Sequence, residues 1–517
     1  MSATLVDDRE FLAMMQERME GMLSLLLYLS RCDSSNLGLT RPFLGSLLSE
    51  AVQIEEVLDS YDAAKNRKWC HVRSLTAAAK TFADASYELL HVRHRLPNYR
   101  LLPVQHDFMT ASNDALTLIG HVMVNVAKEM VAEAGALGLT IPEREDIPQK
   151  YTEPELRGHL PHDCGTRLAK AGADIVAETV TTLATEFLNL ASSSEDVRAA
   201  SRAKPEDYEV CLAASLREES LRRLELRFHN LQSQYDTYVS GSEVESQDTD
   251  LPVLRGQASV VFHLLKIATL FAHFYERHIN RQPSPNAGHS APVVQRHELL
   301  CSLMKYAITF IDQYIGCAVN LCQDMLKRYA EVGQIEVAIP RYRGFHVRPS
   351  TLVSKLVLHY GSRVQMRLGD EAYDAGSSLD LFRANEKINA EKRRWLALEI
   401  VRLDLVSEKS DPADVVPLVR HLVLTLAAKG KLILYEQPLQ LPDRLCPTDG
   451  TTIEKVTAEM GRLLAMGKID IGTDITATFT GDKRVLEDIR LLAQHGYGED
   501  SFGNNIALPD KLAYLKA

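Results

Sequence analysis

Apolar residues at helical spacing dominate roughly the first 332 residues of the chain. For example, Leu116, Ile119, Val122 and Val126 recur every three or four residues and so share one face of a helix. The same spacing predicts helices over residues 9–30, 42–64, 69–95, 108–137, 155–191, 205–238, 253–279 and 293–332. Long helices joined by short connections favour an antiparallel bundle. We therefore expect residues 1–332 to form an all-α helical region, either whole or broken into two sub-bundles near residues 140–155 or 240–252.

Charge and cysteine usage narrow the class of protein. The formal net charge is -11, which argues against a nucleic-acid partner because a phosphate backbone requires a basic surface. The eight cysteines include no C-x-x-C pair, so reduced thiols are the simplest interpretation. We expect neither a metal site nor a cofactor. A Glu88-x-x-His91 pattern matches half of a di-iron motif, but its second half is missing and a solvated helix face is the simpler interpretation.

No segment has the features of a membrane span or a secretory signal. The N-terminal residues MSATLVDDREF are acidic and lack the apolar stretch of a signal peptide. The most apolar segment, residues 258–274, contains His263, Lys266 and His273 and is shorter than the roughly 20 apolar residues that a span needs. We expect a cytoplasmic protein without a membrane span, and the helical region leaves a homo-oligomer open.

The pattern changes from helical spacing to alternation after Gly333. Residues 334–340 and 364–368 alternate as half-buried strands do, and 371–375 follows across a Gly369-Asp370 turn. Helices are predicted over 349–360, 378–385 and 412–430, and the apolar residues 395–405 predict a buried strand. The order is βαββαβα, so we expect an open-faced α/β sandwich over residues 334–430.

The last segment, residues 431–517, predicts a small α+β C-terminal extension. Strands are expected over 432–435 and 475–479, and helices over 453–466 and 483–495. Gly496, Tyr497 and Gly498 predict a turn, because the acidic Glu499 and Asp500 after them would repel a phosphate.

The loop GFHVRPS between the first strand and the next helix has the residues that a covalent phosphate site needs. Pro349 at the first helical position lacks an N–H that would be unpaired there. The amides of Val347 and Arg348 then lie at a helix N-terminus, which attracts anions. Arg348 adds a permanent charge, and the imidazole of His346 is a nucleophile near neutral pH. Gly344 would permit the turn that presents the ring.

This stretch, GFHVRPST, is similar to the G-x-H-x-R-P-A motif of HPr, the histidine-containing phosphocarrier of the sugar phosphotransferase system. The resemblance covers about residues 334–430, and the helical region before it resembles no recognised family. It implies that His346 is the phospho-acceptor and Arg348 its phosphate partner. Gly344, Val347 and Pro349 would complete the phosphate-binding loop. The phosphoryl group would come from an enzyme I-like donor and pass to an acceptor or regulatory target protein.

Other positions either extend the resemblance or depart from it. Arg343 stands where the family has a small polar residue, and an added cation there could help to hold phosphate. The family's regulatory serine opens the second helix, where Ser378 matches best and Ser377 is the alternative. Its docking surface is apolar, a role that Leu379, Leu381 and Phe382 could fill.

These features lead to three functional hypotheses. The first is a phosphocarrier, or a phosphorelay and regulatory protein, modified on His346, which favours a phosphoryl carrier over a stand-alone enzyme. The second is an interaction or scaffold protein that uses the HPr-like domain as a docking module without phosphorylation. The third is an enzyme with its active site inside the helical bundle, which no motif supports.

Overall fold

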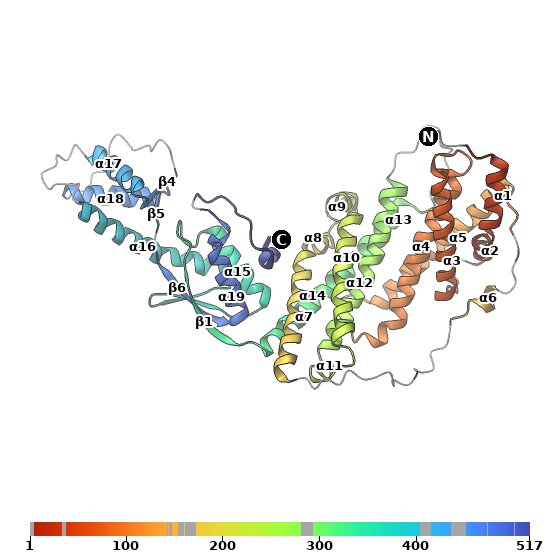
Figure 1. Cartoon of the computed structure of the whole chain (residues 1–517), viewed down its shortest axis with the longest axis horizontal. Coiled ribbons are helices and arrows are strands. Elements are labelled where there is room, and N and C mark those ends of the chain that lie inside the picture. The colour runs from red at the N-terminus through yellow and green to blue at the C-terminus, as the bar shows by residue number, and fades with distance from the viewer. Residues whose placement is uncertain are drawn as a thin grey trace. The chain divides into compact units, whose positions relative to one another are not determined.

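The chain folds as two compact units, residues 1–325 and 326–517 (Figure 1). The computed structural model describes residues 5–33, 38–141, 143, 147–153, 160, 172–280, 293–403, 415–435, 451–472, 474–500 and 502–516.

The N-terminal unit is helical in the part that is described, which confirms the expected all-α region. Its longer helices are α3 (Arg41–Ser60), α4 (Cys70–Arg95), α5 (Phe108–Leu137), α7 (Ala173–Ser193), α10 (Glu218–Tyr238) and α12 (Leu251–Phe274). Shorter helices are α1 (Asp8–Arg18), α2 (Glu20–Ser30), α6 (Ile147–Lys150), α8 (Glu195–Ala200), α9 (Tyr208–Ala214), α11 (Glu243–Gln247) and α13 (Arg296–Ser302). Helix α14 (Thr309–Arg328) begins in this unit. Two π-helical segments, Tyr275–Ile279 and Leu303–Ile308, continue α12 and precede α14.

Local sequence signals set several of these helix ends. Thr40 caps α3 by accepting a hydrogen bond from the backbone N of Phe43, and Pro42 lies in the first turn. Asp107 caps α5 through the amides of Met109 and Thr110. At the other end of α5, Gly138 takes a left-handed φ of 88°, which glycine adopts without steric cost.

The helices pack through apolar faces, with α4 against α3, α5 and α12, and α10 against α12. Within this interface Glu88 is buried and not solvated as the sequence suggested. Its carboxylate pairs with His263 at 2.7 Å and with Lys266, both from α12. The Glu88-x-x-His91 pattern thus belongs to a buried ion-pair cluster. Among the described residues no group of three or more His, Cys, Asp or Glu side chains could hold a metal ion.

Two helices, Phe108–Leu137 and Leu251–Ile279, are long and apolar enough to cross a membrane by length and composition. Of the most apolar stretch, half is buried within the fold in the first helix and 78% in the second. Buried core helices pass the same test, so this is weak evidence for a span.

The C-terminal unit combines helices with short strands. Strands β1 (Val332–Ala338), β6 (Thr476–Asp482), β2 (Gln365–Leu368) and β3 (Glu371–Asp374) form an antiparallel sheet in that spatial order. Helices α15 (Val347–Tyr360), α16 (Ser378–Leu403) and α19 (Lys483–Gln494) pack with this sheet or with one another. Val337, Met366 and Phe479 are among the alternating strand residues that are buried.

The open-faced βαββαβα sandwich predicted over residues 334–430 is wrong. Residues 395–403, expected as a strand, are the end of the long helix α16. The strand between β1 and β2 is β6, which lies outside that range and inside the segment expected to be a separate extension. In the described residues the chain forms short strands in two small antiparallel sheets, set among long helices.

The apolar end of α16 is helical because it packs on a second small core. Leu396 and Ile400, four residues apart, contact apolar residues of α17 (Val415–Ala428), β4 (Leu432–Leu434), α18 (Thr452–Ala465) and β5 (Ile469–Ile471). Strands β4 and β5 pair as a separate two-stranded sheet. Residues 404–414, which include the expected start of the 412–430 helix, lie outside the described part.

Candidate functional site

His346 lies where β1 passes into α15, on the strand–loop–helix that the sequence predicted. Its backbone is the N-cap of α15, and its carbonyl accepts a hydrogen bond from the amide of Ser350 at 3.1 Å. Arg343 and Gly344 just before it both have left-handed φ angles, 55° and 57°. A Cβ at Gly344 would also lie 2.3 Å from Oδ1 of Asn385 on α16, so the Asn385 side chain would have to shift.

Helix α15 begins at Val347, two residues before the predicted start. Pro349 is therefore its third residue and not its first. It still falls among the first residues of the helix, whose amides have no intrahelical acceptor. The amides of Val347 and Arg348 remain at the N-terminus, where the helix dipole favours an anion.

The imidazole of His346 has an oxygen acceptor at each nitrogen. Nε2 lies 2.9 Å from Oε2 of Glu499, and Nδ1 lies 3.2 Å from the carbonyl oxygen of Gly344. A neutral imidazole carries one N–H and can donate to one of these acceptors at a time. The His346 side chain is 22% exposed and that of Glu499 is 11% exposed. A partner molecule can therefore reach the ring, whereas the carboxylate is largely covered.

The segment after α19 positions Glu499. Gly496–Gly498 forms the predicted turn, and Tyr497 within it is buried with a left-handed φ of 55°. Its hydroxyl donates to the carbonyl of Ala338 at the end of β1, at 2.8 Å, and its ring packs edge-on against Phe345. The backbone of Glu499 then bridges Asn505 across a tight loop. The backbone that carries Glu499 is thus anchored to the same strand end that leads into the His346 loop.

Arg348 lies beside this segment. Its Nε atom is buried and has no hydrogen-bond partner among the described residues. Gly498 lies over it, since a Cβ at that position would come within 3.4 Å of Nε and 3.0 Å of Cδ1 of Leu352. This covered Nε–H is a buried donor without an acceptor, whereas the positive charge of the guanidinium lies on the second residue of α15, close to the helix N-terminus.

Arg343 has a structural partner that the sequence did not indicate. Its guanidinium lies over the ring of Tyr435, 4.1 Å from the centroid, and its backbone N donates to Asp470. Burial raises the pKa of Tyr435 to about 12, so its hydroxyl is neutral at physiological pH. Arg343 therefore joins the His346 loop to the β4–β5 sheet.

The start of α16 separates the two serine candidates. The Oγ of Ser377 accepts from the amide of Asp380 at 3.2 Å, so Ser377 acts as a capping residue. Ser378 is the first residue of α16 and is exposed.

Of the proposed docking residues, Leu379 and Phe382 are exposed, but Leu381 is buried in the core.

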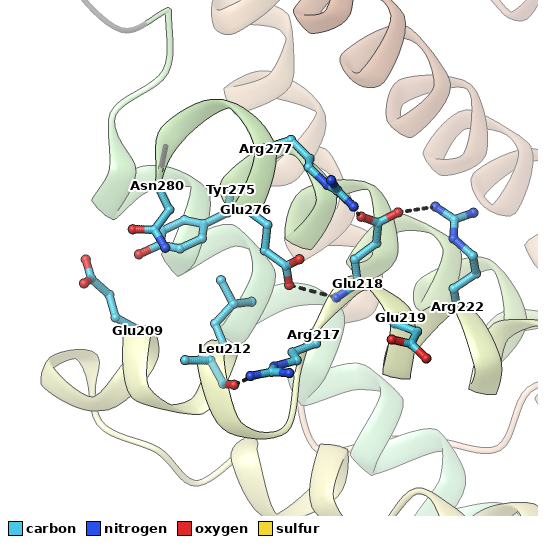
Figure 2. Close-up of a pocket in the computed structure, with 11 residues that line it drawn as sticks. Glu209, Leu212, Arg217, Glu218, Glu219, Arg222, Tyr275, Glu276, Arg277 and Asn280 are labelled. Carbon is cyan, nitrogen blue, oxygen red and sulfur yellow. Dashed lines mark hydrogen bonds and ion pairs between the residues drawn. The ribbon is translucent and has the colours of Figure 1, made fainter. Parts of the chain in front are cut away.

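A pocket lies in the N-terminal unit, away from His346 (Figure 2). It has a volume of about 710 Å³, between the α9–α10 connection and the end of α12. Several of its charged side chains already have partners: Glu218 pairs with Arg222 and with His273, both at 2.9 Å, and Glu276 accepts from the amide of Glu218. The lining residues present no nucleophile paired with a base, so the bundle-enzyme hypothesis gains no support here.

Comparison of the chain with known protein families, characterised proteins and solved structures found no match. The functional argument therefore depends on the His346 site itself.

Proposed function

We propose that the protein accepts a phosphoryl group on His346 and acts as a phosphocarrier or phosphorelay protein. The observation that carries this proposal is the position of the ring. His346 is the N-cap of α15, it is partly exposed, and Arg348 is the second residue of the helix, with a guanidinium that carries a permanent positive charge. A helix N-terminus and a guanidinium each stabilise a dianion bound to the ring. The likeness of GFHVRPST to the HPr motif supports the same role.

The surface around the site fits a protein donor. Val347, next to His346, is 73% exposed, and Leu379 and Phe382 on α16 are 68% and 49% exposed. Asn385, three residues after Phe382, lies against Gly344, so α16 reaches the His346 loop. Exposed apolar side chains beside a reactive residue favour docking of a partner protein. A donor that resembles enzyme I and a downstream acceptor or regulatory target are the proposed partners.

One observation favours the second hypothesis, a docking module without phosphorylation. The His346–Glu499 pair gives Nε2 a largely covered carboxylate as its acceptor, which is also what a purely structural histidine would have. The two hypotheses differ in whether His346 takes up phosphate.

The test is incubation of the full chain with phosphoenolpyruvate and enzyme I, then intact-mass analysis at neutral pH. The phosphocarrier hypothesis predicts a gain of one acid-labile phosphoryl group in the wild type and in His421→Ala, a variant of an exposed histidine on α17. His346→Ala should show no gain. If His346→Ala gains as much phosphate as the wild type, His346 is not the acceptor.

A further inference from the structure

A groove between α16 and α18 in the C-terminal unit is lined mainly by apolar and small residues. Its volume is about 530 Å³. The apolar lining consists of Leu396, Ala397 and Val401 from α16 and Ile453, Ala458 and Gly461 from α18. Val401 is 63% exposed, so the groove leaves hydrocarbon surface in contact with solvent. A ligand with an apolar part would gain free energy by covering this surface.

Gly461 contributes open space to the groove. It lies inside α18, it has no left-handed φ, and a Cβ added there would meet nothing within 4 Å. Neither the backbone conformation nor the packing of the fold therefore requires glycine at this position. Glycine weakens a helix interior relative to alanine, so its presence costs stability. A larger side chain at Gly461 would fill part of the groove.

The polar side chains of the groove differ in whether they already have partners. The carboxylate of Glu454 accepts from the amide of Thr451 at 2.8 Å, in the capping box that begins α18. The hydroxyl of Thr457 donates to the carbonyl of Ile453, also at 2.8 Å. Arg393 lines the groove without a hydrogen-bond or ion-pair partner among the described residues. The groove thus has one uncommitted charge, and this charge is positive and permanent.

The two helices run in opposite directions, so this charge lies at one end of the groove (Figure 1). Asp470 of β5, the strand that follows α18, pairs with α16 one residue before Arg393. The later part of α18, with Gly461, therefore lies on the Arg393 side, and Glu454 lies toward Val401. Arg393 and Val401 are eight residues apart, which is about 12 Å along a helix.

We propose that this groove binds an aliphatic carboxylate, with its head group at Arg393 and its chain along Ala397 and Val401. Charge complementarity selects the head group, because an anion gives the Arg393 guanidinium the partner that it lacks. The length of the groove sets the chain. An extended chain advances about 1.25 Å per carbon, from C–C bonds of about 1.5 Å and near-tetrahedral angles, so about 12 Å holds roughly ten carbons.

The experiment is isothermal titration calorimetry of the full chain with decanoate, octanoate and octan-1-ol, each below the concentration at which it forms micelles or separates. Gly461→Leu fills the groove, and Arg393→Gln removes its charge. Arg394→Gln is the matched control, because Arg394 is the next residue, is exposed, pairs with Glu391 and does not line the groove. Circular dichroism checks that each variant is folded, and analytical ultracentrifugation measures whether the chain associates.

We expect one saturable decanoate site in the wild type and in Arg394→Gln. Octanoate should bind about 3- to 10-fold more weakly, because it buries two fewer CH₂ groups in a groove that is open on one side. Arg393→Gln should weaken decanoate about 2- to 5-fold, the range for an exposed ion pair, and leave octan-1-ol unchanged. Gly461→Leu should weaken decanoate at least about 10-fold, since its side chain takes the place of two or more CH₂ groups.

Three results would overturn the proposal. The first is a wild type without saturable decanoate binding, and the second is wild-type affinity in Gly461→Leu or in Arg393→Gln. The third is a wild type that dimerises and binds no decanoate beside a monomeric Gly461→Leu, which would assign the groove to a second copy of the chain.

Discussion

Lys392 on α16 and Asp470 on β5 form a buried ion pair, with Nζ of the lysine 2.7 Å from Oδ1 of the aspartate. The lysine side chain is fully buried and that of the aspartate is 5% exposed. The other carboxylate oxygen accepts from the backbone N of Arg343. One aspartate thus connects the small β4–β5 sheet, the long helix α16 and the loop that carries His346.

Asp470→Asn should destabilise the C-terminal unit strongly. The substitution keeps the size of the side chain but leaves the Lys392 ammonium buried without a countercharge, a change that typically costs about 3–5 kcal/mol. Urea unfolding monitored by circular dichroism measures the loss. Asp474→Asn, at an exposed position nearby, should stay within about 0.5 kcal/mol of the wild type. Equal stability of the two variants would show that the pair does not hold this region together.

Gly344→Ala should disturb the His346 loop itself. Gly344 has a φ of 57°, and a Cβ would lie 2.3 Å from Asn385, so we expect a loss of about 1–3 kcal/mol together with slower phosphate uptake. Gly461→Ala is the matched control, because Gly461 lies inside α18 with nothing within 4 Å of an added Cβ. That control should gain up to about 1 kcal/mol from helix propensity. A Gly344→Ala protein as stable as the control would contradict the described loop geometry.

Arg348→Gln should impair phosphate uptake without a comparable loss of stability. Removal of the guanidinium takes away a charge-assisted partner of the phosphoryl group, and we expect the rate with phosphoramidate to fall about 10-fold or more. Arg348→Lys should not restore the wild-type rate, because an ammonium lacks the planar fork of the guanidinium. Arg367→Gln, an exposed change on β2, serves as the control. Unchanged rates in Arg348→Gln would exclude a phosphate contact by this side chain.

The N-terminal unit should lose stability as the pH falls, in two ranges. Burial, and after it the nearby His263, lowers the pKa of His91 from 6.5 to about 4, so the unfolded chain takes up this proton first and stability falls between pH 6.5 and 4. Burial alone would raise the pKa of Glu88, but His263 and Lys266 lower it from 4.5 to about 2. The stability that this carboxylate contributes is complete above pH 4.5 and is lost toward pH 2.

Urea unfolding at a series of pH values measures both effects. His91→Asn should flatten the decrease between pH 6.5 and 4, and Glu88→Gln should flatten the decrease below pH 4.5 while lowering stability at neutral pH. The same slope in His91→Asn and the wild type would contradict the inferred lowering of the His91 pKa in the folded protein.

The sequence predicts those elements of the fold whose structure depends on neighbouring residues in the chain. The long helices of the first unit are predicted by apolar spacing, and the strand–loop–helix around His346 by alternation, Gly344 and Pro349. The prediction for the apolar residues 395–403 is wrong because a short apolar run fits a buried strand or a helix equally well. These residues are helical because they pack against α17 and α18, which a reading of the local sequence does not reveal.

The sequence also fails to predict the parts of the site that depend on contacts between residues far apart in the chain. Strand β6 pairs with β1 and β2 although more than a hundred residues separate it from either, and no local pattern encodes such pairing. The sequence assigns Glu499 only to an acidic turn, because its contact with His346 depends on the same long-range arrangement. One sequence feature could have indicated that this turn is fixed to the fold. Tyr497 lies between two glycines, and a large aromatic side chain in such a turn often anchors the turn to a core.

The most direct test of phosphate uptake by His346 is intact-mass analysis of the full chain after incubation with phosphoramidate, with and without a short acid treatment. We predict a gain of one phosphoryl group that acid removes, present in the wild type and in His421→Ala and absent from His346→Ala. A folded wild-type protein that gains no phosphate, or a His346→Ala protein that gains as much as the wild type, would contradict the proposed role of His346.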